Sequence, residues 1–510
     1  MKKIVASILC FTLCAGMIAG CDDKKDTTKA TEGTQPTQSE SQADTESQAD
    51  TESQADTESQ ADTETEGEST AKTDTTAVLS MGTGDIAINV YAMSNEVPGM
   101  IEEFFKRNPD MASKYKVTAL VSNNDGNGYE TKLNAALSAG GDIAPDLYVA
   151  EADYILPYTQ GDLSSFAAPY SSFIDGVDGK ITEADIAKYT VELGTNTSGE
   201  LVALCYQCTG GAMIYSAKIA KEVFGGDDAA TVEAAIGAGS GSWDKFIEAA
   251  GKLKEKGYAT VSALGDLWNV CEKAAQTPWV VDGALKIDPQ REKYLDLCKT
   301  FIENDYTNDA AAWNESWYAD MQGVGKDPQT NETRKCFCFF GPAWLINYVM
   351  GGQSTTPETG FGDWRVCQPP VGFWWGGSWL CVNKAAVENA DKKAFLSKFV
   401  EWVTLDCTKD GLQYAWANGL MNENGTKDTV ASGTVMKMSD GSMDFLGGQN
   451  PFDAFVKATA FASAKCKSLY DASLNGTWQN CGSAYGHGDK DKDTVIAEFK
   501  DAAAEIGLEV

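Results

Sequence analysis

The chain of 510 residues carries a formal net charge of −33, from 74 Asp and Glu against 41 Lys and Arg. This excess of acidic side chains argues against a polyanionic partner, so we expect no binding of nucleic acid. The single histidine, His487, offers neither a histidine-based zinc site nor an imidazole pair for nucleophilic catalysis. No cofactor or metal is therefore predicted, although the oxygen-rich loop from Asn123 to Gly128 leaves a structural calcium open.

The N-terminal segment has the pattern of an export signal. Two lysines precede an apolar run that is short for a membrane span and ends at Cys21, which predicts a signal peptide over residues 1–20. The tetrapeptide Ile18-Ala-Gly-Cys resembles the lipobox of bacterial lipoproteins, which implies that Cys21 becomes an acylated N-terminus. Acyl chains there would anchor the protein to the extracellular face of the cell membrane, and we expect a Gram-positive source.

Residues 21–77 are rich in Thr, Ser, Gln, Ala, Asp and Glu and repeat the hexapeptide SQADTE four times from Ser41 to Glu64. With almost no apolar side chains, this segment cannot bury a core. Its acidic residues repel one another and keep the chain extended. We therefore predict a disordered acidic tether between the lipid anchor and a folded part.

Strands and helices alternate at the start of the folded part. The sequence predicts strands over Ile86–Tyr91, Lys116–Val121 and Pro145–Val149, with an amphipathic helix after each of the first two. This order is typical of βαβ units and predicts an α/β fold with a parallel sheet.

Polar side chains follow these strands at the edge where α/β sheets bind their ligands. Asn95 and Glu96 follow the first strand, and Glu151 and Asp153 follow the third. Carboxylates and amides suit hydroxyl groups, which both donate and accept hydrogen bonds. We therefore predict that these four side chains bind a hydroxyl-rich ligand.

Eleven cysteines follow Cys21, an odd number that cannot all pair. Cys205 and Cys208 have CxxC spacing, and Cys336 and Cys338 alternate as strand residues do. A zinc site would need a second close pair or histidines. We predict that these cysteines are mainly small buried hydrophobes.

The segment VGFWWGGSW, residues 371–379, gathers aromatic surface beside flexible backbone. A pyranose has faces of C–H groups and a rim of hydroxyls, so an indole can cover a face while polar side chains bind the rim. Trp374 and Trp375 point to opposite sides if the chain is extended, so only one of them is expected to contact ligand. Trp313 and Trp317 lie four apart on a predicted helix, where they form either a core stripe or a cleft wall.

The chain resembles the extracellular solute-binding lipoproteins of carbohydrate ABC importers, family 1, which is maltose-binding-protein-like. The resemblance follows the lipobox and tether with INVYAMSNEVPGMIEEFFKRNP, LNAALSAGGDIAPDLYVAEADYILPY, LVALCYQCTGGAMIYSAKIAKEVFG, SWDKFIEAAGKLKEKG, FFGPAWLINYV, WRVCQPPVGFWWGGSWLCVNKAA and AFLSKFVEWVTLD. It covers essentially the whole chain after residue 80, and its strength lies in the order of the segments.

This resemblance implies a two-lobed periplasmic-binding-protein-like fold with a hinge and an interlobe cleft. It implies that Trp344 and Trp268 occupy positions where the family has cleft aromatics, and that Gln207 lies in a crossing strand. The implied boundaries are lobe 1 over 78–204 and 380–408, lobe 2 over 205–379 and 409–510, and crossing strands near 204–209 and 376–380.

The solute class follows from what the sequence lacks. Only four arginines are present and none lies on a predicted cleft loop, which argues against phosphate, sulfate or carboxylate ligands. A neutral sugar fits best, and the number of aromatic side chains favours an oligosaccharide. The resemblance implies delivery to the transmembrane subunits of an ABC permease by a protein that we expect to be a monomer.

Two other classes of protein stay open. A peptide or amino-acid receptor would need charged groups to bind the ligand's termini, and the shortage of arginine argues against it. A secreted glycoside hydrolase would need two carboxylates facing each other across the scissile bond, whereas Glu151 and Asp153 share one loop. We therefore expect a binding protein and no catalytic residues.

Overall fold

The computed structural model describes residues 76–124 and 127–510. The predicted signal peptide, the anchor Cys21 and all of the predicted tether before Thr76 lie outside the described residues. The candidate calcium loop from Asn123 to Gly128 is described only in part.

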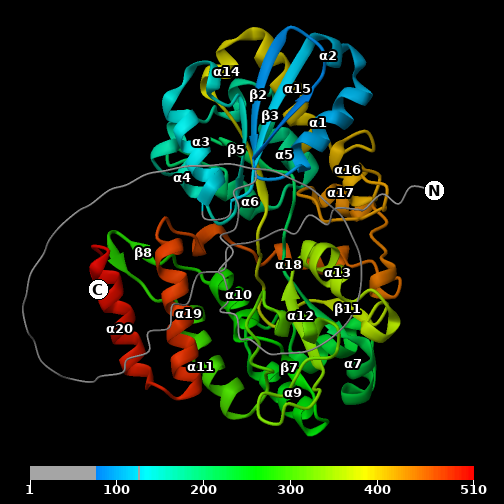
Figure 1. The fold of residues 1–510 in the computed structure, drawn as a ribbon, viewed down its shortest axis with the longest axis vertical. Helices are drawn as coiled ribbons and strands as arrows, with labels where there is room; N and C mark the ends of the chain where they lie inside the picture. Colours follow the sequence, from blue (N-terminus) through cyan, green and yellow to red (C-terminus); the bar gives the residue numbers. More distant parts are fainter. Residues whose placement is uncertain (1–75, 125–126) are drawn as a thin grey trace, which may run out of the picture. The chain divides into compact units, whose positions relative to one another are not determined.

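The first lobe is built on a mixed six-stranded sheet, drawn in the upper half of Figure 1. Its strands are β1 (Thr76–Met81), β2 (Ile86–Ala92), β3 (Tyr115–Ser122), β4 (Leu147–Glu151), β5 (Ala203–Cys205) and β12 (Ser378–Val382). They lie in the order β1-β3-β2-β4-β12-β5. The predicted parallel pairing is confirmed for β2 with β3 and β4, whereas β1, β12 and β5 join the sheet antiparallel.

The sequence does not predict strand β1, whose first two residues, Thr76 and Ala77, fall within the predicted tether. The structure pairs all six residues of β1 with β3, from Thr76 opposite Ser122 to Met81 opposite Val117. Its side chains are mostly exposed, so the strand lacks the alternation of apolar residues that would reveal it in the sequence. Backbone hydrogen bonds to the edge of an existing sheet define this strand.

The second lobe is built on a smaller sheet in the order β11-β6-β10-β7. Its strands are β6 (Ala212–Ser216), β7 (Ala259–Val261), β10 (Cys336–Gly341) and β11 (Trp364–Cys367). The strand predicted around Cys336 and Cys338 is therefore confirmed. A separate hairpin of β8 (Val280–Val281) and β9 (Ala284–Leu285) lies beside the C-terminal helices (Figure 1).

Helices cover the faces of both sheets (Figure 1). The first lobe holds α1 (Glu96–Arg107), α2 (Pro109–Lys114), α3 (Gly128–Ala139), α4 (Leu156–Thr159), α5 (Val177–Ala184), α6 (Lys188–Leu193), α14 (Lys384–Glu388) and α15 (Ala390–Thr404). The second holds α7 (Ala217–Phe224), α8 (Ala229–Ile236), α9 (Asp244–Glu255), α10 (Leu264–Ala274), α11 (Pro289–Glu303), α12 (Glu315–Met321), α13 (Gly351–Gln353), α18 (Phe452–Thr459), α19 (Asp471–His487) and α20 (Lys492–Glu505).

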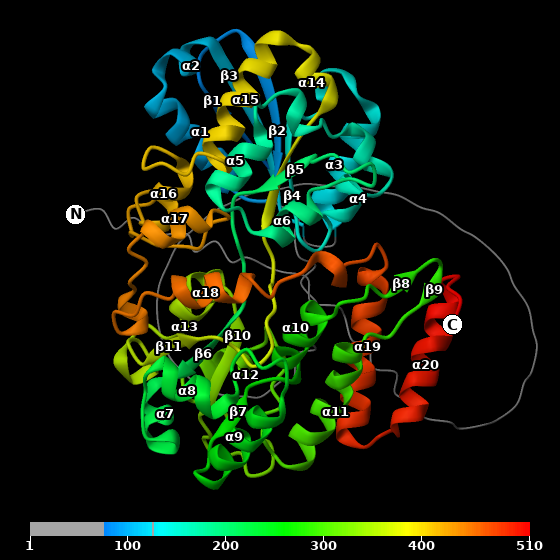
Figure 2. The same cartoon turned by 180° about the vertical axis from the view of Figure 1, so that it is seen from behind.

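Two chain segments connect the sheets, and Figure 2 shows them running between the lobes. One leads from β5, which ends at Cys205, to β6, and the other leads from β11 to β12, which begins at Ser378. They meet at a bridge between Gly210 and Trp374. These segments overlap the predicted crossing strands near 204–209 and 376–380.

Helices α16 (Leu412–Ala417) and α17 (Gly433–Met438) link the two lobes. The family resemblance implies that residues 409–510 belong to the second lobe. In the structure α16 packs on α15 and α17 packs on α5, both in the first lobe, while α17 also contacts α18 in the second. Residues 409–438 therefore belong to neither lobe alone.

Hydrophobic packing explains the positions of these helices. The buried face of α1 carries Met100, Ile101, Phe104 and other apolar residues at helical spacing. Phe104 packs edge-on against Phe399 of α15, with ring centroids 5.4 Å apart.

The eleven cysteines of the described part are unpaired, and all except Cys407 are buried, as predicted. Among the described helices, none has the length and apolar character needed to cross a membrane.

Candidate functional site

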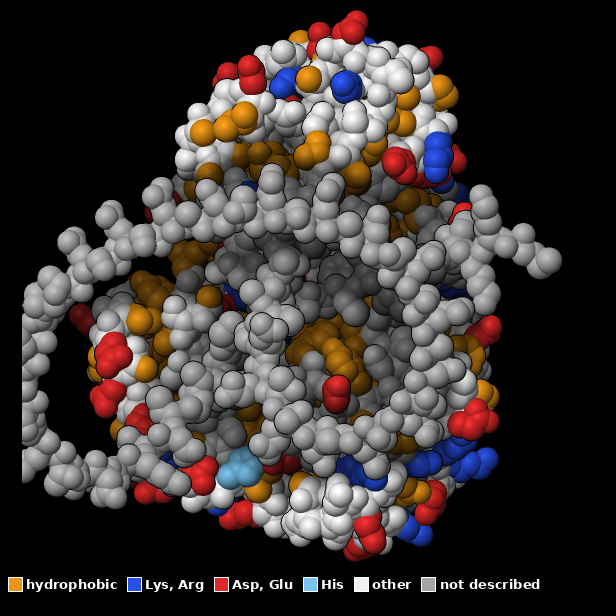
Figure 3. Space-filling model, viewed as in Figure 1, with side chains coloured by type: hydrophobic (Ala, Val, Ile, Leu, Met, Phe, Trp, Pro, Cys, Tyr) orange, Lys and Arg blue, Asp and Glu red, His pale blue; other side chains and the backbone are white. Residues whose placement is uncertain are grey.

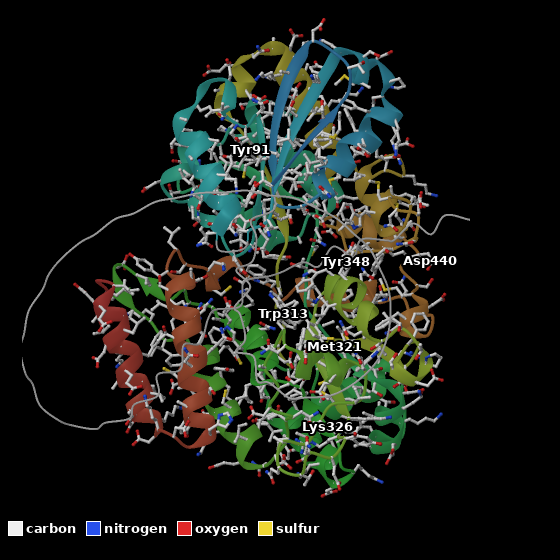
Figure 4. All side chains as sticks on the ribbon, viewed as in Figure 1. Tyr91, Trp313, Met321, Lys326, Tyr348 and Asp440 are labelled. Atoms are coloured by element: carbon white, nitrogen blue, oxygen red, sulfur yellow. The ribbon has the colours of Figure 1, made fainter. Side chains whose placement is uncertain are left out.

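A cavity of about 190 Å³ lies where the lobes meet. Both lobes and the connecting segments line it, which is typical of ligand sites at domain junctions. Figure 3 shows hydrophobic side chains gathered on the lower lobe near this junction. Figure 4 shows Trp313 and Tyr348 close to the same junction. The lining residues are Met93, Glu96, Glu151, Gln207, Trp313, Tyr318, Trp344, Tyr348, Val349, Gln353, Gly376, Gly377 and Ser378.

Two half-buried indoles form aromatic walls of the cavity. The rings of Trp313 and Trp344 are nearly parallel, with an interplanar angle of 15° and centroids 6.2 Å apart. The buried Trp375 crosses them at 72° and 67°, with its centroid 5.9 Å from Trp313 and 4.8 Å from Trp344. Trp375 therefore supports both walls from behind.

The backbone beside Trp375 keeps this part of the cavity open. Gly376 and Gly377 have φ values of +86° and +118°, which glycine adopts without a steric cost. A Cβ atom on Gly376 would lie 3.2 Å from Trp344 Nε1 and 3.5 Å from Glu151 Oε1. The glycine thus lets an indole and a carboxylate approach the same stretch of main chain.

Glu96, at the start of α1, gives one polar wall. Its Oε2 accepts a 2.8 Å hydrogen bond from the Tyr206 hydroxyl. Burial raises the pKa of Glu96, and the Tyr206 hydrogen bond opposes that rise. A carboxylate in this position can accept hydrogen bonds from a bound hydroxyl group.

Gln207 and Asp428 extend this wall toward the connecting segments. The Gln207 side-chain Nε2 donates a 3.2 Å hydrogen bond to Asp428 Oδ2. Burial raises the pKa of Asp428 to about 7, against the hydrogen bond from the Thr429 backbone N–H. Asp428 thus orients the Gln207 side chain and leaves its amide oxygen free to accept a hydrogen bond from a ligand.

Glu151, the last residue of strand β4, is another carboxylate of the cavity lining. Its Oε2 accepts a 2.8 Å hydrogen bond from the backbone N–H of Asp153. Burial, together with the neighbouring charge of Asp153, raises the pKa of Glu151. Glu151 therefore exchanges a proton more readily near neutral pH than an exposed glutamate does.

Asp153 contributes to contacts between elements instead of lining the cavity. Its Oδ1 lies 3.9 Å from Lys273 Nζ, at the end of α10, and 3.7 Å from Lys467 Nζ. Both lysines are nearly fully buried and also pair with acids of their own, Lys273 with Glu272 and Lys467 with Asp471. Burial raises the pKa of Asp153, but the two lysine charges outweigh it and hold the pKa below its usual range.

The structure places the other predicted residues outside the lining. Asn95 is exposed at the N-terminus of α1. Trp268 is buried in the second lobe edge-on to Tyr294, because α10 turns that face toward α11. Trp317 is buried as well, and its Nε1 donates a 3.1 Å hydrogen bond to Asp266 Oδ1.

The pair Trp374 and Trp375 points to opposite sides of the chain, as the extended conformation predicts. Trp374 is fully buried, stacks on Tyr189 with centroids 4.9 Å apart, and donates from Nε1 to the Ser463 carbonyl. Trp375 packs against the two wall indoles. Neither indole is among the lining residues: Trp375 packs behind the two wall indoles, and Trp374 belongs to the core of the first lobe.

Sequence reasoning missed several lining residues. Tyr348 lies four residues after Trp344, on a short π-helix that spans Leu345–Met350, so helical spacing from Trp344 could have indicated it. Met93 carries no comparable signal, because chain folding alone brings it to the cavity. Within residues 76–124 and 127–510, no group of His, Cys, Asp and Glu is arranged to hold a metal ion.

The fold and the cavity together define a two-lobed binding protein with its ligand site between the lobes. The chain belongs to the family of bacterial extracellular solute-binding proteins, whose model matches residues 99–437. The family description places such proteins outside the cytoplasm. A comparison with curated proteins gives no match.

Solved structures show the same fold at low sequence identity. A family 1 extracellular solute-binding protein is similar with a TM-score of 0.65 and 15% identity, over 82% of this chain and 99% of its own. The galacto-N-biose/lacto-N-biose I-binding protein of Bifidobacterium longum gives 0.56 and 16%, over 84% and 99%. The cyclic alpha-maltosyl-1,6-maltose binding protein of Arthrobacter globiformis gives 0.57 and 15%, over 82% and 98%.

Proposed function

We propose that this protein is the substrate-binding component of an ABC importer for a neutral sugar, and that its physiological ligand is an oligosaccharide. The observation that carries the proposal is a cavity with indole walls and a rim of carboxylate and amide groups between two lobes. Indoles cover the C–H faces of a pyranose, while Glu96, Glu151 and Gln207 bind its hydroxyls. Structural neighbours of this fold bind oligosaccharides, which supports the same ligand class here.

Binding is coupled to the relative position of the lobes. Side chains from both lobes line one cavity, so a sugar held there contacts both at once and favours the closed arrangement. A cavity of about 190 Å³ is small beside the 300–1,000 Å³ usual for ligand pockets, so further sugar units must lie at its mouth. The closed form is the one that the membrane permease recognises.

The proposed location is the extracellular face of the cell membrane, with Cys21 acylated and residues 21–77 as the tether. The support is the lipobox-like sequence before Cys21 and the polar repeat after it. Mass spectrometry of the detergent-extracted protein tests the anchor. A diacylglyceryl group on Cys21 that is absent from Cys21→Ser supports it, and an unmodified N-terminus contradicts it.

The sugar-binding proposal is tested by calorimetric titration of the purified full chain against neutral oligosaccharides of different linkage and length. Micromolar affinity that increases over the first few sugar units supports the proposal. If the folded protein binds no member of the panel, that result contradicts the proposal. Titration with short peptides and amino acids then tests the receptor class that remains.

A secreted glycoside hydrolase is a second candidate, because two carboxylates with raised pKa, Glu96 and Glu151, line the same cavity. Hydrolysis requires one such acid to be protonated and the other ionised across the glycosidic bond. Incubation of a bound oligosaccharide followed by chromatography separates the two functions. An unchanged ligand supports the receptor, whereas shortened sugars that disappear with Glu151→Gln support the enzyme.

A further inference from the structure

His487, the only histidine of the chain, ends helix α19 in contact with a distant loop. Its Nε2 lies 2.7 Å from Asp309 Oδ2, and its Nδ1 lies 2.9 Å from the backbone carbonyl oxygen of Ser483. An ionised carboxylate and a carbonyl oxygen can only accept hydrogen bonds. Both ring nitrogens must therefore carry a proton, so His487 is an imidazolium in this arrangement.

The groups around His487 favour the protonated ring. Partial burial lowers the pKa of His487, but the hydrogen bonds to Asp309 and Ser483 and the charges of Asp309 and Asp489 raise it above its usual range. A neutral imidazole has a single N–H and can keep only one of the two hydrogen bonds. The contact is therefore complete below the pKa of His487 and weakens as the pH rises through it.

Helix α11 packs against α19 and supplies the other ionisable groups near this contact. Burial raises the pKa of the Cys298 thiol to about 12, so this thiol stays neutral where histidine titrates. The Lys299 Nζ lies 5.5 Å from the centroid of the Tyr485 ring and 3.0 Å from Glu303 Oε1. The lysine thus pairs with an acid of its own helix, and His487 is the cation in contact with Asp309.

Asp309 belongs to the loop that leads to Trp313 in the cavity lining. The backbone N–H of Asp309 donates a 3.0 Å hydrogen bond to Thr307 Oγ1, and that of Ala310 donates one of 3.0 Å to the Ser262 carbonyl. Asp309 and Trp313 both have left-handed backbone, with φ of +52° and +69°. Aspartate tolerates this region, whereas a bulky residue there is an outlier. The loop therefore ends in a strained residue.

The strain at Trp313 persists because the neighbouring chain is fixed on both sides, since such a conformation relaxes where its surroundings allow it. Helix α12 begins at Glu315, shortly after the strained residue. Before it, the loop is held by the hydrogen bond to Ser262 and by the contact of Asp309 with His487. Weakening of the contact at Asp309 should therefore change the conformation of Trp313.

We propose that the His487 imidazolium is a positioning group for the ligand cavity: it holds Asp309 and so fixes the loop that carries Trp313, and the affinity for ligand falls when the histidine loses its proton. The Trp313 ring contacts Trp344 and Trp375, so a shift of this residue changes the shape of the cavity lining. The effect on affinity rests on the proposed sugar-binding function. The effect on Trp313 can be measured without a ligand.

The first experiment is an NMR pH titration of the full chain, labelled with 5-fluorotryptophan and purified without a histidine tag. The single histidine gives one imidazole Cε1–H signal, and its pH dependence measures the pKa of His487 directly. The ¹⁹F signal of Trp313 is the one that disappears in Trp313→Phe. We expect the pKa of His487 to exceed the usual value of about 6.5, and part of the Trp313 shift to have the same midpoint.

Variants isolate the histidine from other carboxyl groups, such as Asp266, that titrate in the same range. His487→Gln and Asp309→Asn should both remove the part of the Trp313 shift that follows the histidine. Glu498→Gln breaks an exposed pair with Lys490 close to the same end of α19, and as the matched control it should leave that part unchanged. A Trp313 profile that is the same in His487→Gln and the parent overturns the inference, as does a pKa of His487 at or below about 6.5.

Calorimetric titrations with cellotriose and maltotriose, at about pH 6 and about pH 9, measure the effect on affinity. We expect the affinity of the parent to fall between these pH values by roughly two- to fivefold more than that of His487→Gln, which is the range that a partly exposed ion pair can supply. Equal pH dependence in the two proteins overturns the inference. If neither sugar binds at either pH, that result counts against the proposed function for these sugars, and the ¹⁹F titration alone decides the positioning role.

Discussion

The Nε1–H of Trp344 donates a 3.1 Å hydrogen bond to the backbone carbonyl of Trp375, so a wall of the cavity is fixed to a connecting segment between the lobes. This bond joins two parts of the chain that are 31 residues apart. The indole is half-buried, with one polar group satisfied by the protein and ring surface left for the cavity. Movement of the connecting segment must therefore move the aromatic wall, which couples the hinge to the ligand site.

Removal of this indole should affect binding more than stability. We expect Trp344→Ala to weaken oligosaccharide binding at least tenfold, about 1.4 kcal/mol, because a stacking face and an anchored wall disappear together. Trp344→Phe keeps a ring but loses the hydrogen bond, so its loss should be smaller. Calorimetry measures both affinities, and thermal unfolding shows that both variants are folded. Unchanged affinity of Trp344→Ala would remove this residue from the site.

Gly376 should tolerate no side chain. Gly376→Ala forces a left-handed alanine, at a cost of roughly 1–2 kcal/mol, and directs a methyl group between Trp344 and Glu151. We expect the loss of binding to exceed what this change in stability alone would produce. Gly425→Ala is the matched control, because Gly425 has φ of +66° but no neighbouring atom within 4 Å of the added Cβ. Equal effects of the two variants on binding would contradict the prediction.

Local patterns in the sequence were enough to predict the α/β class and the elements around the site. Alternating apolar residues in Ile86–Tyr91 and helical spacing in the following segment fix β2 and α1, because local burial determines both. Polar residues after β2 and β4 were expected at the ligand, and Glu96 and Glu151 do line the cavity. Asp153, two residues further, instead meets lysines from distant segments, and no local pattern could show those contacts.

The tryptophans show the same limit of prediction from local sequence patterns. Trp313 and Trp344 line the cavity. Trp268 and Trp317 lie in similar sequence patterns, but they are buried away from it. Their different roles depend on the direction in which a loop or helix turns its face, which long-range packing decides. The left-handed backbone of Trp313 is a result of such packing, since residue type alone argues against it.

Asp153 should stabilise the closed arrangement. Its carboxylate, after β4 in the first lobe, faces Lys273 of the second lobe and Lys467. We expect Asp153→Asn to weaken ligand binding severalfold, mainly through faster dissociation, because a charge contact that supports closure is lost. Stopped-flow tryptophan fluorescence measures the rates. Asp185→Asn, which removes one partner of an exposed pair with Lys437, is the control and should leave the rates unchanged. Identical dissociation rates in all three proteins would rule out this role.

Stability should fall as the pH rises from about 5 to about 8, with Asp266 as a main cause. Burial raises the pKa of Asp266 to about 7, although Ala263 N and the Trp317 indole donate hydrogen bonds to it. The folded state therefore binds this proton more strongly than the unfolded state, whose aspartate has a pKa of about 3.9. Stability from the protonated form is fully present below the unfolded pKa and is lost as the pH rises toward 7. Burial acts in the same direction on Asp320, whose pKa it raises to about 6.

Asp266→Asn tests this assignment, because asparagine keeps the shape of the side chain but does not titrate. The variant loses one hydrogen-bond acceptor at every pH, so we expect its curve to be offset by a constant amount. The change in unfolding free energy between pH 5 and pH 8 should be smaller than in the parent by on the order of 2 kcal/mol. Urea unfolding at several pH values measures both curves. Parallel curves would show that Asp266 keeps the same protonation state throughout, and the pH dependence would then have to arise from other buried carboxyl groups with a raised pKa, such as Asp320.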